Sequence, residues 1–287
     1  MVIVFDVLAR LPLWLLHRIG TLLGWVVYLS SGRYARRLRA NLQSAGLADS
    51  RDGYRKLVRA NVSEAGKGIM ELPWVWRRPL EKVLTGVKQY HGWEHIEAAV
   101  AQGKGVIALT PHLGCFEIIS LFIAARLPIT TMYRPPRWAF LDKLMYEGRA
   151  RGQTKLAPTD LGGVRQLIKT LKHGGIIGVL PDQVPGNGEG EWVPFFGRPA
   201  YTMTLIGKLI KSSGAAVVMC SSERLPHGEG YALHFTPLAI DPAISIPAQI
   251  NAVLEKTIRT CPEQYLWSYN RYKVPRGALP PDTVKEQ

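Results

Sequence analysis

Strand-like and helix-like segments alternate along the sequence from residue 94 onward, and this alternation constrains the fold more than any other feature. The segments expected to be strands are 105–109, 129–133, 154–157, 176–180, 215–221 and 231–237. Those expected to be helices are 94–103, 116–127, 138–151, 163–172, 201–213 and 247–260. Strands separated by helices usually pair in parallel. The sequence therefore predicts an α/β fold with a mostly parallel central sheet flanked by helices.

Other segments depart from this alternation. Residues 33–87 have a helical pattern and many basic side chains, and residues 181–199 contain several Gly and Pro residues. These Gly and Pro residues predict a long loop over 181–199. Loops of this length inside compact domains usually serve function. Residues 262–272 have the aromatic pattern of a strand. We expect a main domain over 33–275 and a frayed tail over 276–287.

The first 32 residues are mostly apolar. Asp6, Arg10, His17 and Arg18 interrupt the apolar pattern, and the longest uncharged run, 19–32, is shorter than the roughly 20 residues of a spanning helix. The basic run 33–39 follows, as is typical of segments beside anionic lipid. We expect residues 1–32 to anchor the chain to a membrane, either across it or in its interface. The alternative is a core helix with a basic neighbour.

The net charge indicates an anionic partner. Lys and Arg number 36 against 22 Asp and Glu, which gives +14. Nucleic acid, an anionic membrane and an acidic substrate all fit this charge. The three cysteines form no CxxC pair, so the sequence favours a reducing, cytoplasm-facing environment over a disulfide framework.

A histidine and a carboxylate follow the strand-like run 105–109. His112 comes three residues after that run, and Glu117 lies in the first turn of the next expected helix. On one continuous helix, residues five apart would lie about 140° from each other and could not meet. The pair can meet only if His112 precedes the helix and Gly114 lets the chain turn. A histidine held in this way can take a proton from a hydroxyl group. We therefore expect His112 and Glu117 to be a catalytic pair.

Further polar side chains lie at the ends of expected strands and helices. They are Arg134, Arg149, Arg151, Asp182 and Gln183. If the strands before His112 and Arg134 are neighbours in the sheet, Arg134 lies close to His112. Arginine forks suit phosphate and carboxylate oxygens, and Asp182 is placed to orient a basic group or the acceptor. We expect these five residues to bind substrate.

Two alternative chemistries involve Cys115. It could be a nucleophile with His112 as its base, or a metal ligand together with His112 and Glu117. The sequence contains no second cluster of His or Cys at metal spacing, so we expect no metal. A small buried thiol without a chemical role is the third interpretation.

Six ordered segments together resemble the bacterial lipid A biosynthesis late acyltransferases, the lauroyl and myristoyl transferases of the HxxxxD/E acyltransferase superfamily. The matching segments are His112-Leu113-Gly114-Cys115-Phe116-Glu117, Tyr133-Arg134-Pro135, Gly148-Arg149-Ala150-Arg151, Pro181-Asp182-Gln183, Phe195-Phe196-Gly197 and Pro262-Glu263-Gln264-Tyr265-Leu266-Trp267. The apolar start and its basic successor are also similar, so the resemblance covers nearly the whole chain.

The resemblance implies an acyltransferase that moves a fatty acyl chain from acyl carrier protein to a hydroxyl of a Kdo-bearing lipid A precursor. His112 would act as the base and Glu117 would orient it, with Arg134 and backbone amides near Gly114 as donors to the oxyanion. Arg149 or Arg151 would grip acceptor phosphates. The implied partners are acyl carrier protein, an anionic lipid acceptor and the cytoplasmic face of the inner membrane, with no nucleic acid and no cofactor beyond the acyl donor.

Two segments differ from the family pattern. Cys115-Phe116 stands where the family usually has Asn-Trp, and Tyr269-Asn270-Arg271 stands where it often has His-Arg-Arg. These differences leave a second acceptor class open: a phospholipid, a glycolipid or an ornithine-type lipid. A basic membrane- or nucleic-acid-binding module without catalysis is the alternative from a different class.

Overall fold

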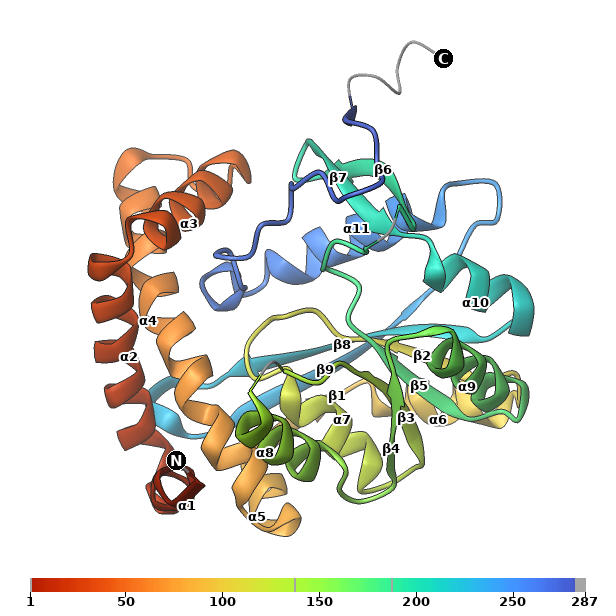
Figure 1. Ribbon diagram of the computed structural model, residues 1–287, viewed down its shortest axis with the longest axis horizontal. Helices are drawn as coiled ribbons and strands as arrows, with labels where there is room; N and C mark the ends of the chain where they lie inside the picture. Colours follow the sequence, from red (N-terminus) through yellow and green to blue (C-terminus); the bar gives the residue numbers. More distant parts are fainter. Residues whose placement is uncertain (1, 137, 187, 282–287) are drawn as a thin grey trace.

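A computed structural model describes residues 2–136, 138–186 and 188–281 (Figure 1). Its described residues form a mixed seven-stranded sheet in which only β8 and β9 pair antiparallel. In spatial order the strands are β1 (Val87–His91), β9 (Tyr231–Leu238), β8 (Ala216–Arg224), β2 (Val106–Leu109), β5 (Ile176–Val179), β3 (Ile129–Tyr133) and β4 (Thr154–Pro158). The predicted mostly parallel sheet is confirmed.

Helices cover both faces of this sheet, and the inner strands are buried on both sides. The helices after residue 92 are α6 (Trp93–Ala101), α7 (Glu117–Ala124), α8 (Ala139–Arg149), α9 (Leu161–Lys172), α10 (Leu205–Ser213) and α11 (Ile246–Ile258). Within β2, Ile107 and Leu109 pack into one hydrophobic cluster, whereas Val106 and Ala108 pack into the other. This alternation follows from the period of two in a strand. The predicted α/β class is therefore correct.

Among the described residues, five helices precede β1. They are α1 (Val2–Arg10), α2 (Leu13–Ser30), α3 (Gly32–Ser44), α4 (Arg51–Arg77) and α5 (Leu80–Leu84). The backbones of α2 and α4 touch, because a Cβ atom on Gly66 would lie only 1.9 Å from the carbonyl oxygen of Gly20. Small residues permit this kind of close helix contact. The apolar N-terminal helix thus packs along the long α4, at the left of Figure 1.

Two segments differ from their predicted structure. Instead of a loop over 181–199, strands β6 (Gly190–Phe195) and β7 (Arg198–Met203) form an antiparallel hairpin. It turns at Phe196 and Gly197, whose φ angles of 47° and 71° suit a tight hairpin turn. Within 262–272 the expected strand is replaced by a short 3-10 turn at Pro262–Gln264 and a single bridge from Tyr265 to Leu113. The tail prediction extends to residues 282–287, which lie outside the described residues.

A buried ion network joins α2, α4 and β8. Glu71 of α4 accepts hydrogen bonds from both His17 of α2, at 2.7 Å, and Arg224 of β8, at 2.6 and 2.8 Å. Burial alone would raise the pKa of Glu71, but the charge of Arg224 and the hydrogen bonds from His17 and Arg224 outweigh it and lower the pKa to about 2. The Glu71 carboxylate of the folded protein is therefore ionised at neutral pH.

This network predicts a loss of stability in acid. Because the folded pKa of Glu71 is about 2 and its ordinary value is 4.5, the unfolded chain binds more protons between these pH values. The free energy of unfolding should therefore keep this contribution above pH 4.5 and lose it as the pH falls toward 2. Urea unfolding at pH 5.5 and pH 3 measures the difference. In Glu71→Gln the difference should shrink; an unchanged difference would contradict the assignment.

Candidate active site

His112 lies in a sharp turn between β2 and α7. Gly114, two residues on, has a φ angle of 57°, and a Cβ atom there would lie 1.9 Å from the carbonyl oxygen of Ser222. Only glycine avoids this clash and this strained backbone conformation. The turn is held by a bond of 3.1 Å from the Gly114 N–H to the carbonyl of Gln264. As predicted from the sequence, the histidine thus precedes the helix.

Asp182 is the carboxylate that contacts His112. It follows β5, the strand beside β2, and its Oδ1 lies 2.8 Å from His112 Nδ1 while its Oδ2 accepts from the His112 backbone N–H at 2.8 Å. On the other side of the ring, Gln183 Nε2 lies 3.1 Å from His112 Nε2. A carboxylate needs a proton on Nδ1, and an amide donor needs a lone pair on Nε2. These two contacts therefore select the imidazole tautomer whose basic nitrogen is Nε2.

The environment of Asp182 keeps it ionised. Burial would raise the pKa of this carboxyl group, but the charge of His112 and the hydrogen bonds from its ring and backbone outweigh burial, so the pKa lies below its ordinary value. Tyr265 also approaches this carboxylate, and burial together with Asp182 holds the pKa of the Tyr265 phenol well above its usual range. Tyr265 therefore remains a neutral donor beside the His112–Asp182 pair.

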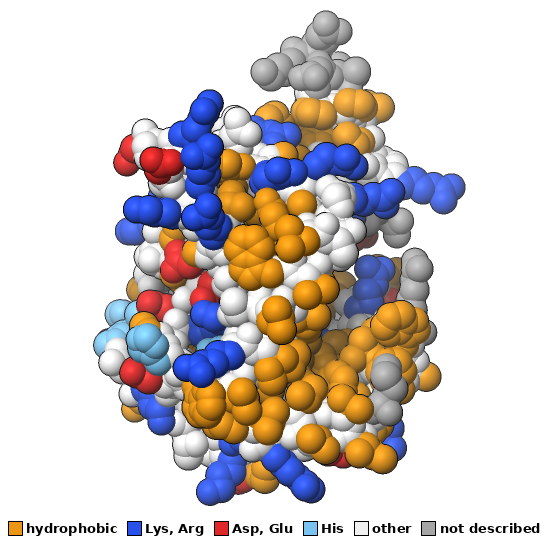
Figure 2. Space-filling model, turned by 90° about the vertical axis from the view of Figure 1, so that its left-hand side faces the viewer, with side chains coloured by type: hydrophobic (Ala, Val, Ile, Leu, Met, Phe, Trp, Pro, Cys, Tyr) orange, Lys and Arg blue, Asp and Glu red, His pale blue; other side chains and the backbone are white. Residues whose placement is uncertain are grey.

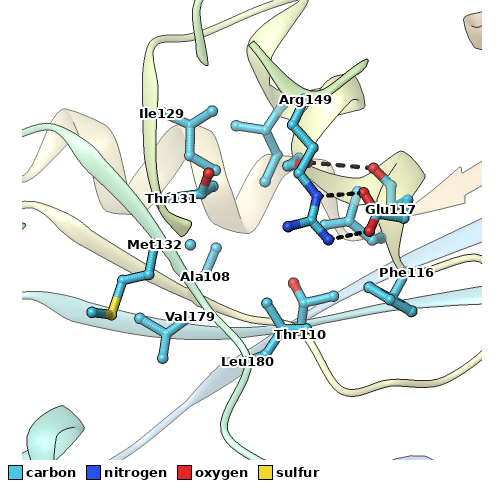
Figure 3. A pocket seen from close by; sticks show the side chains of 14 residues that line it. Ala108, Thr110, Phe116, Glu117, Ile129, Thr131, Met132, Arg149, Val179 and Leu180 are labelled. Atoms are coloured by element: carbon cyan, nitrogen blue, oxygen red, sulfur yellow. Dashed lines mark hydrogen bonds and ion pairs between the residues drawn. The ribbon is translucent and has the colours of Figure 1, made fainter. Parts of the chain in front are cut away.

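Glu117 contacts Arg149 instead of His112. Arg149 Nε donates to Glu117 Oε2 at 2.9 Å and Arg149 Nη2 binds Glu117 Oε1 (Figure 3). Trp76 Nε1 of α4 also donates to Glu117 Oε2, at 3.2 Å. Burial would raise the pKa of Glu117, but the Arg149 charge and these hydrogen bonds lower it overall. In place of the expected direct pair with His112, the described residues thus show Glu117 in a buried ion pair with Arg149. The reason is that α7 turns its first carboxylate toward α4 and α8, while the end of β5 reaches the histidine.

The sheet order also changes the position of Arg134. Because β5 lies between β2 and β3, the strand before Arg134 is not the neighbour of the strand before His112. Arg134 is exposed and lines neither cavity of this site. The expected adjacency of Arg134 and His112 is therefore replaced by that of His112 with Asp182 and Gln183.

Arg151 is engaged by backbone carbonyl groups. Its Nε donates to Gly148 at 2.7 Å, its Nη1 to Arg78 at 2.5 Å, and its Nη2 binds the carbonyl of Val75. Burial lowers its pKa to about 10. These contacts connect the end of α8 to the end of α4, and each of its three nitrogens is engaged by a carbonyl. Arg151 is thus fully engaged within the protein, whereas Nη1 of Arg149 has no partner among the described residues.

Two cavities meet at this site. The larger, about 290 Å³, is lined by His112, Glu117 and Arg149 and by apolar side chains that include Ile69, Leu72 and Met145. The smaller, about 40 Å³, lies between α7 and the sheet and is shown in Figure 3. Its walls are mainly aliphatic, with Glu117 and Arg149 on one side. An apolar compartment thus lies beside the polar groups, as a substrate with a hydrocarbon chain requires.

Cys115 is not an activated thiol. It is buried, and burial raises its pKa well above the ordinary value, assisted by the charge of Glu71. A nucleophilic cysteine needs a lowered pKa. Across the chain except for its masked residues, no cluster of three His, Cys, Asp or Glu side chains could hold a metal ion. The geometry therefore favours base chemistry at His112 over the thiol alternative.

Several side chains of the site come from segments outside the sequence motifs. Trp76 of α4 binds Glu117, and Glu64, Glu71 and Arg224 line the larger cavity. Trp76 and Arg224 lie at the ends of α4 and β8, and no local spacing connects them to His112. The one sequence feature that could have pointed to these residues is the mixture of basic and acidic side chains in α4, a helix that also has an apolar face.

Known proteins resemble this chain over nearly its full length. Residues 1–274 match the family described as bacterial lipid A biosynthesis acyltransferase. A lipid A biosynthesis lauroyltransferase of Escherichia coli K12 is 29% identical over 282 residues, covering 96% of this chain and 91% of the relative. A palmitoleoyltransferase of the same organism is 26% identical over 92% of this chain and 87% of its own length. A lipid A biosynthesis acyltransferase of Haemophilus influenzae is 29% identical over 92% of this chain and 86% of its own length.

Proposed function

The chain belongs to the bacterial lipid A biosynthesis acyltransferase family and is an O-acyltransferase of the late type, and we propose that it takes its acyl chain from acyl carrier protein. The proposed acceptor is a hydroxyl of a Kdo-bearing lipid A precursor at the cytoplasmic face of the inner membrane. One observation carries the assignment: a histidine with Nδ1 held by a buried carboxylate lines a cavity with apolar walls. The net charge of +14 suits an acidic carrier protein and a phosphorylated lipid.

The first chemical step is removal of the acceptor proton. The acceptor hydroxyl takes the place of the Gln183 amide at His112 Nε2, and its proton passes to that nitrogen as its oxygen attacks the thioester carbonyl. Asp182 stabilises the imidazolium that forms, because its ionised carboxylate lies 2.8 Å from Nδ1. The tetrahedral intermediate then expels the carrier thiolate, which takes the proton back from Nε2. The ester and a free thiol result, and His112 returns to its starting state.

Backbone N–H groups at the start of α7 are the proposed donors to the tetrahedral oxyanion. The N–H of Gly114 is bound to Gln264, whereas the backbone N–H groups of Cys115 and Phe116 have no acceptor within the described part of the chain. Phe116 is the N-cap of α7 and Cys115 is the residue directly before it, where the helix dipole also favours negative charge. Each well-placed donor is worth about 3 kcal/mol at a transition state. Arg149 Nη1 is the corresponding candidate for an acceptor phosphate.

A reconstitution with purified enzyme tests the proposed donor and acceptor. Acyl carrier protein loaded with C10 to C16 chains is mixed with Kdo-bearing tetraacyl lipid A precursor, and the product mass is read by mass spectrometry. We expect the acceptor to gain one acyl group at a rate that depends on the carrier. Transfer to a phospholipid, glycolipid or ornithine lipid in place of the precursor would instead establish the alternative acceptor. Transfer from acyl-CoA alone would overturn the donor assignment.

A further inference from the structure

We propose that α2 does not cross the membrane but lies in the plane of the bilayer interface, as part of an apolar face of α1, α2 and α8 onto which the larger cavity opens. The partner is an anionic lipid surface. This inference goes beyond the proposed reaction, since it holds for any lipid acceptor. By length and hydropathy alone α2 could span a membrane, with 18 residues and a mean hydropathy of 1.3. The contacts of α2 argue against this.

Helix α2 has a buried side and, opposite it, an exposed apolar stripe. The side with Leu13, Leu16, His17, Gly20 and Gly24 is buried against the protein. The opposite stripe is exposed at Trp14, Ile19, Leu22, Val26 and Leu29, with 67% of Leu22 and 76% of Leu29 accessible. A helix that crosses a bilayer by itself is surrounded by lipid and needs no side packed against protein. A helix that lies in an interface has one apolar side toward the lipid and another side that can pack against the protein.

Helix α2 is fixed to the catalytic domain along its length. Gly20 and Gly24 touch the backbone of α4 at Gly66 and Val62, and His17 is in a buried hydrogen bond with Glu71. A spanning α2 would have to leave α4, which would uncover Glu71 and Arg224. Otherwise it would pull α4 with its charged side chains into hydrocarbon. Moving ionised groups to the bilayer centre costs free energy. An in-plane α2 avoids this cost and keeps its contacts with α4.

The apolar face continues from α2 to its neighbours. Exposed apolar side chains gather over this side of the molecule, with Lys and Arg side chains around them (Figure 2). Exposed apolar side chains on the neighbouring helices are Val4 and Val7 of α1, Trp138 at the N-cap of α8, and Tyr146 of α8. Monomeric soluble proteins rarely expose continuous apolar patches of this kind. The face is therefore a surface for a hydrophobic partner.

The charges beside this face identify the partner as anionic lipid. Arg10, Arg18, Arg33 and Arg36 are exposed on α1, α2 and α3, and the Arg18 guanidinium lies 5.1 Å from the ring centre of Trp14. Basic residues next to interfacial tryptophan are typical of contact with anionic head groups. Ile69 is 51% exposed and also lines the cavity of His112, so this cavity opens where the apolar surface is accessible. A lipid acceptor could enter from the bilayer without crossing water.

Cysteine labelling in intact cells distinguishes the two topologies. The native cysteines Cys115, Cys220 and Cys261 are buried, so a single new cysteine at Ile3 or at Ser30 gives a clean signal. An in-plane α2 predicts that a membrane-impermeant maleimide labels neither I3C nor S30C in intact cells, and both after the cells are opened. Labelling of either position from the periplasm would overturn the proposal.

Vesicle binding of the full chain tests the surface itself. We expect L22E/V26E to weaken binding to phosphatidylglycerol-containing vesicles by at least about tenfold, since two apolar contacts are lost and two charges added. L161E, on the exposed start of α9, is the matched control and should change binding less than twofold. Equal loss in both variants, no loss in L22E/V26E, or a dimer in solution without vesicle binding would contradict an anionic bilayer as the partner. Activity of L22E/V26E in detergent should persist, so a failure of the proposed reaction is separable from a failure of this proposal.

Discussion

His112→Ala is expected to lower kcat for acyl transfer by about 10²- to 10⁴-fold, the contribution of a general base. The side chain whose Nε2 accepts the acceptor proton is then missing, and no other histidine lines the larger cavity in the described residues. The measurement is single-turnover transfer from acyl carrier protein to the lipid A precursor. The acceptor KM should change far less than kcat, because His112 acts mainly on the transition state.

His173→Ala is the control for this substitution. His173 is exposed at the end of α9, where its Nδ1 lies 2.7 Å from the carbonyl of Lys169. It should keep the wild-type rate. A His112→Ala enzyme that retains more than a tenth of the wild-type kcat, with unchanged folding by circular dichroism, would exclude His112 as the base.

Asp182→Asn is expected to reduce kcat by about 10²- to 10⁴-fold, as is typical when the carboxylate that orients a catalytic histidine is lost. The asparagine amide can present one oxygen and one NH₂ group to His112, where the native carboxylate accepts from both the ring and the backbone. One of the two His112 donors must then face another donor, so the ring turns or changes tautomer. Proton acceptance at Nε2 is lost in either case.

Asp52→Asn provides the matched control, because this carboxylate is exposed and its partner Arg55 is a surface residue. Its kcat should equal that of the wild type, since exposed ion pairs contribute little. If Asp182→Asn kept the wild-type kcat while the protein remained folded, the contact with His112 would have no part in the reaction.

The alternation of strands and helices was sufficient to predict the α/β class and the position of His112 at a strand end. Both follow from local patterns that are visible in a single sequence. The hairpin β6–β7 is not predicted, because Gly190, Pro194 and Gly197 are residue types typical of loops. A tight turn between two strands uses the same residue types. Local patterns therefore predicted most of the framework.

The partners within the site depend on the order of strands, which local patterns do not contain. Glu117 is near His112 in sequence, but β5 lies beside β2 and brings Asp182, 70 residues away, to the histidine. Arg151 resembled a phosphate ligand because it is a basic residue after a helix. Its role depends instead on the packing of α8 against the end of α4, which adds the carbonyl oxygens of Val75 and Arg78 to that of Gly148 in α8.

The most direct test of the central claim is a double-mutant cycle of kcat for His112→Ala, Asp182→Asn and the two combined. If Asp182 acts only through His112, Asp182→Asn should lower kcat strongly in the wild-type background. It should lower kcat less than about threefold once His112 is gone, because residues that act as a unit are far from additive. Losses that simply multiply would contradict the account, since Asp182 would then act on the reaction independently of the histidine.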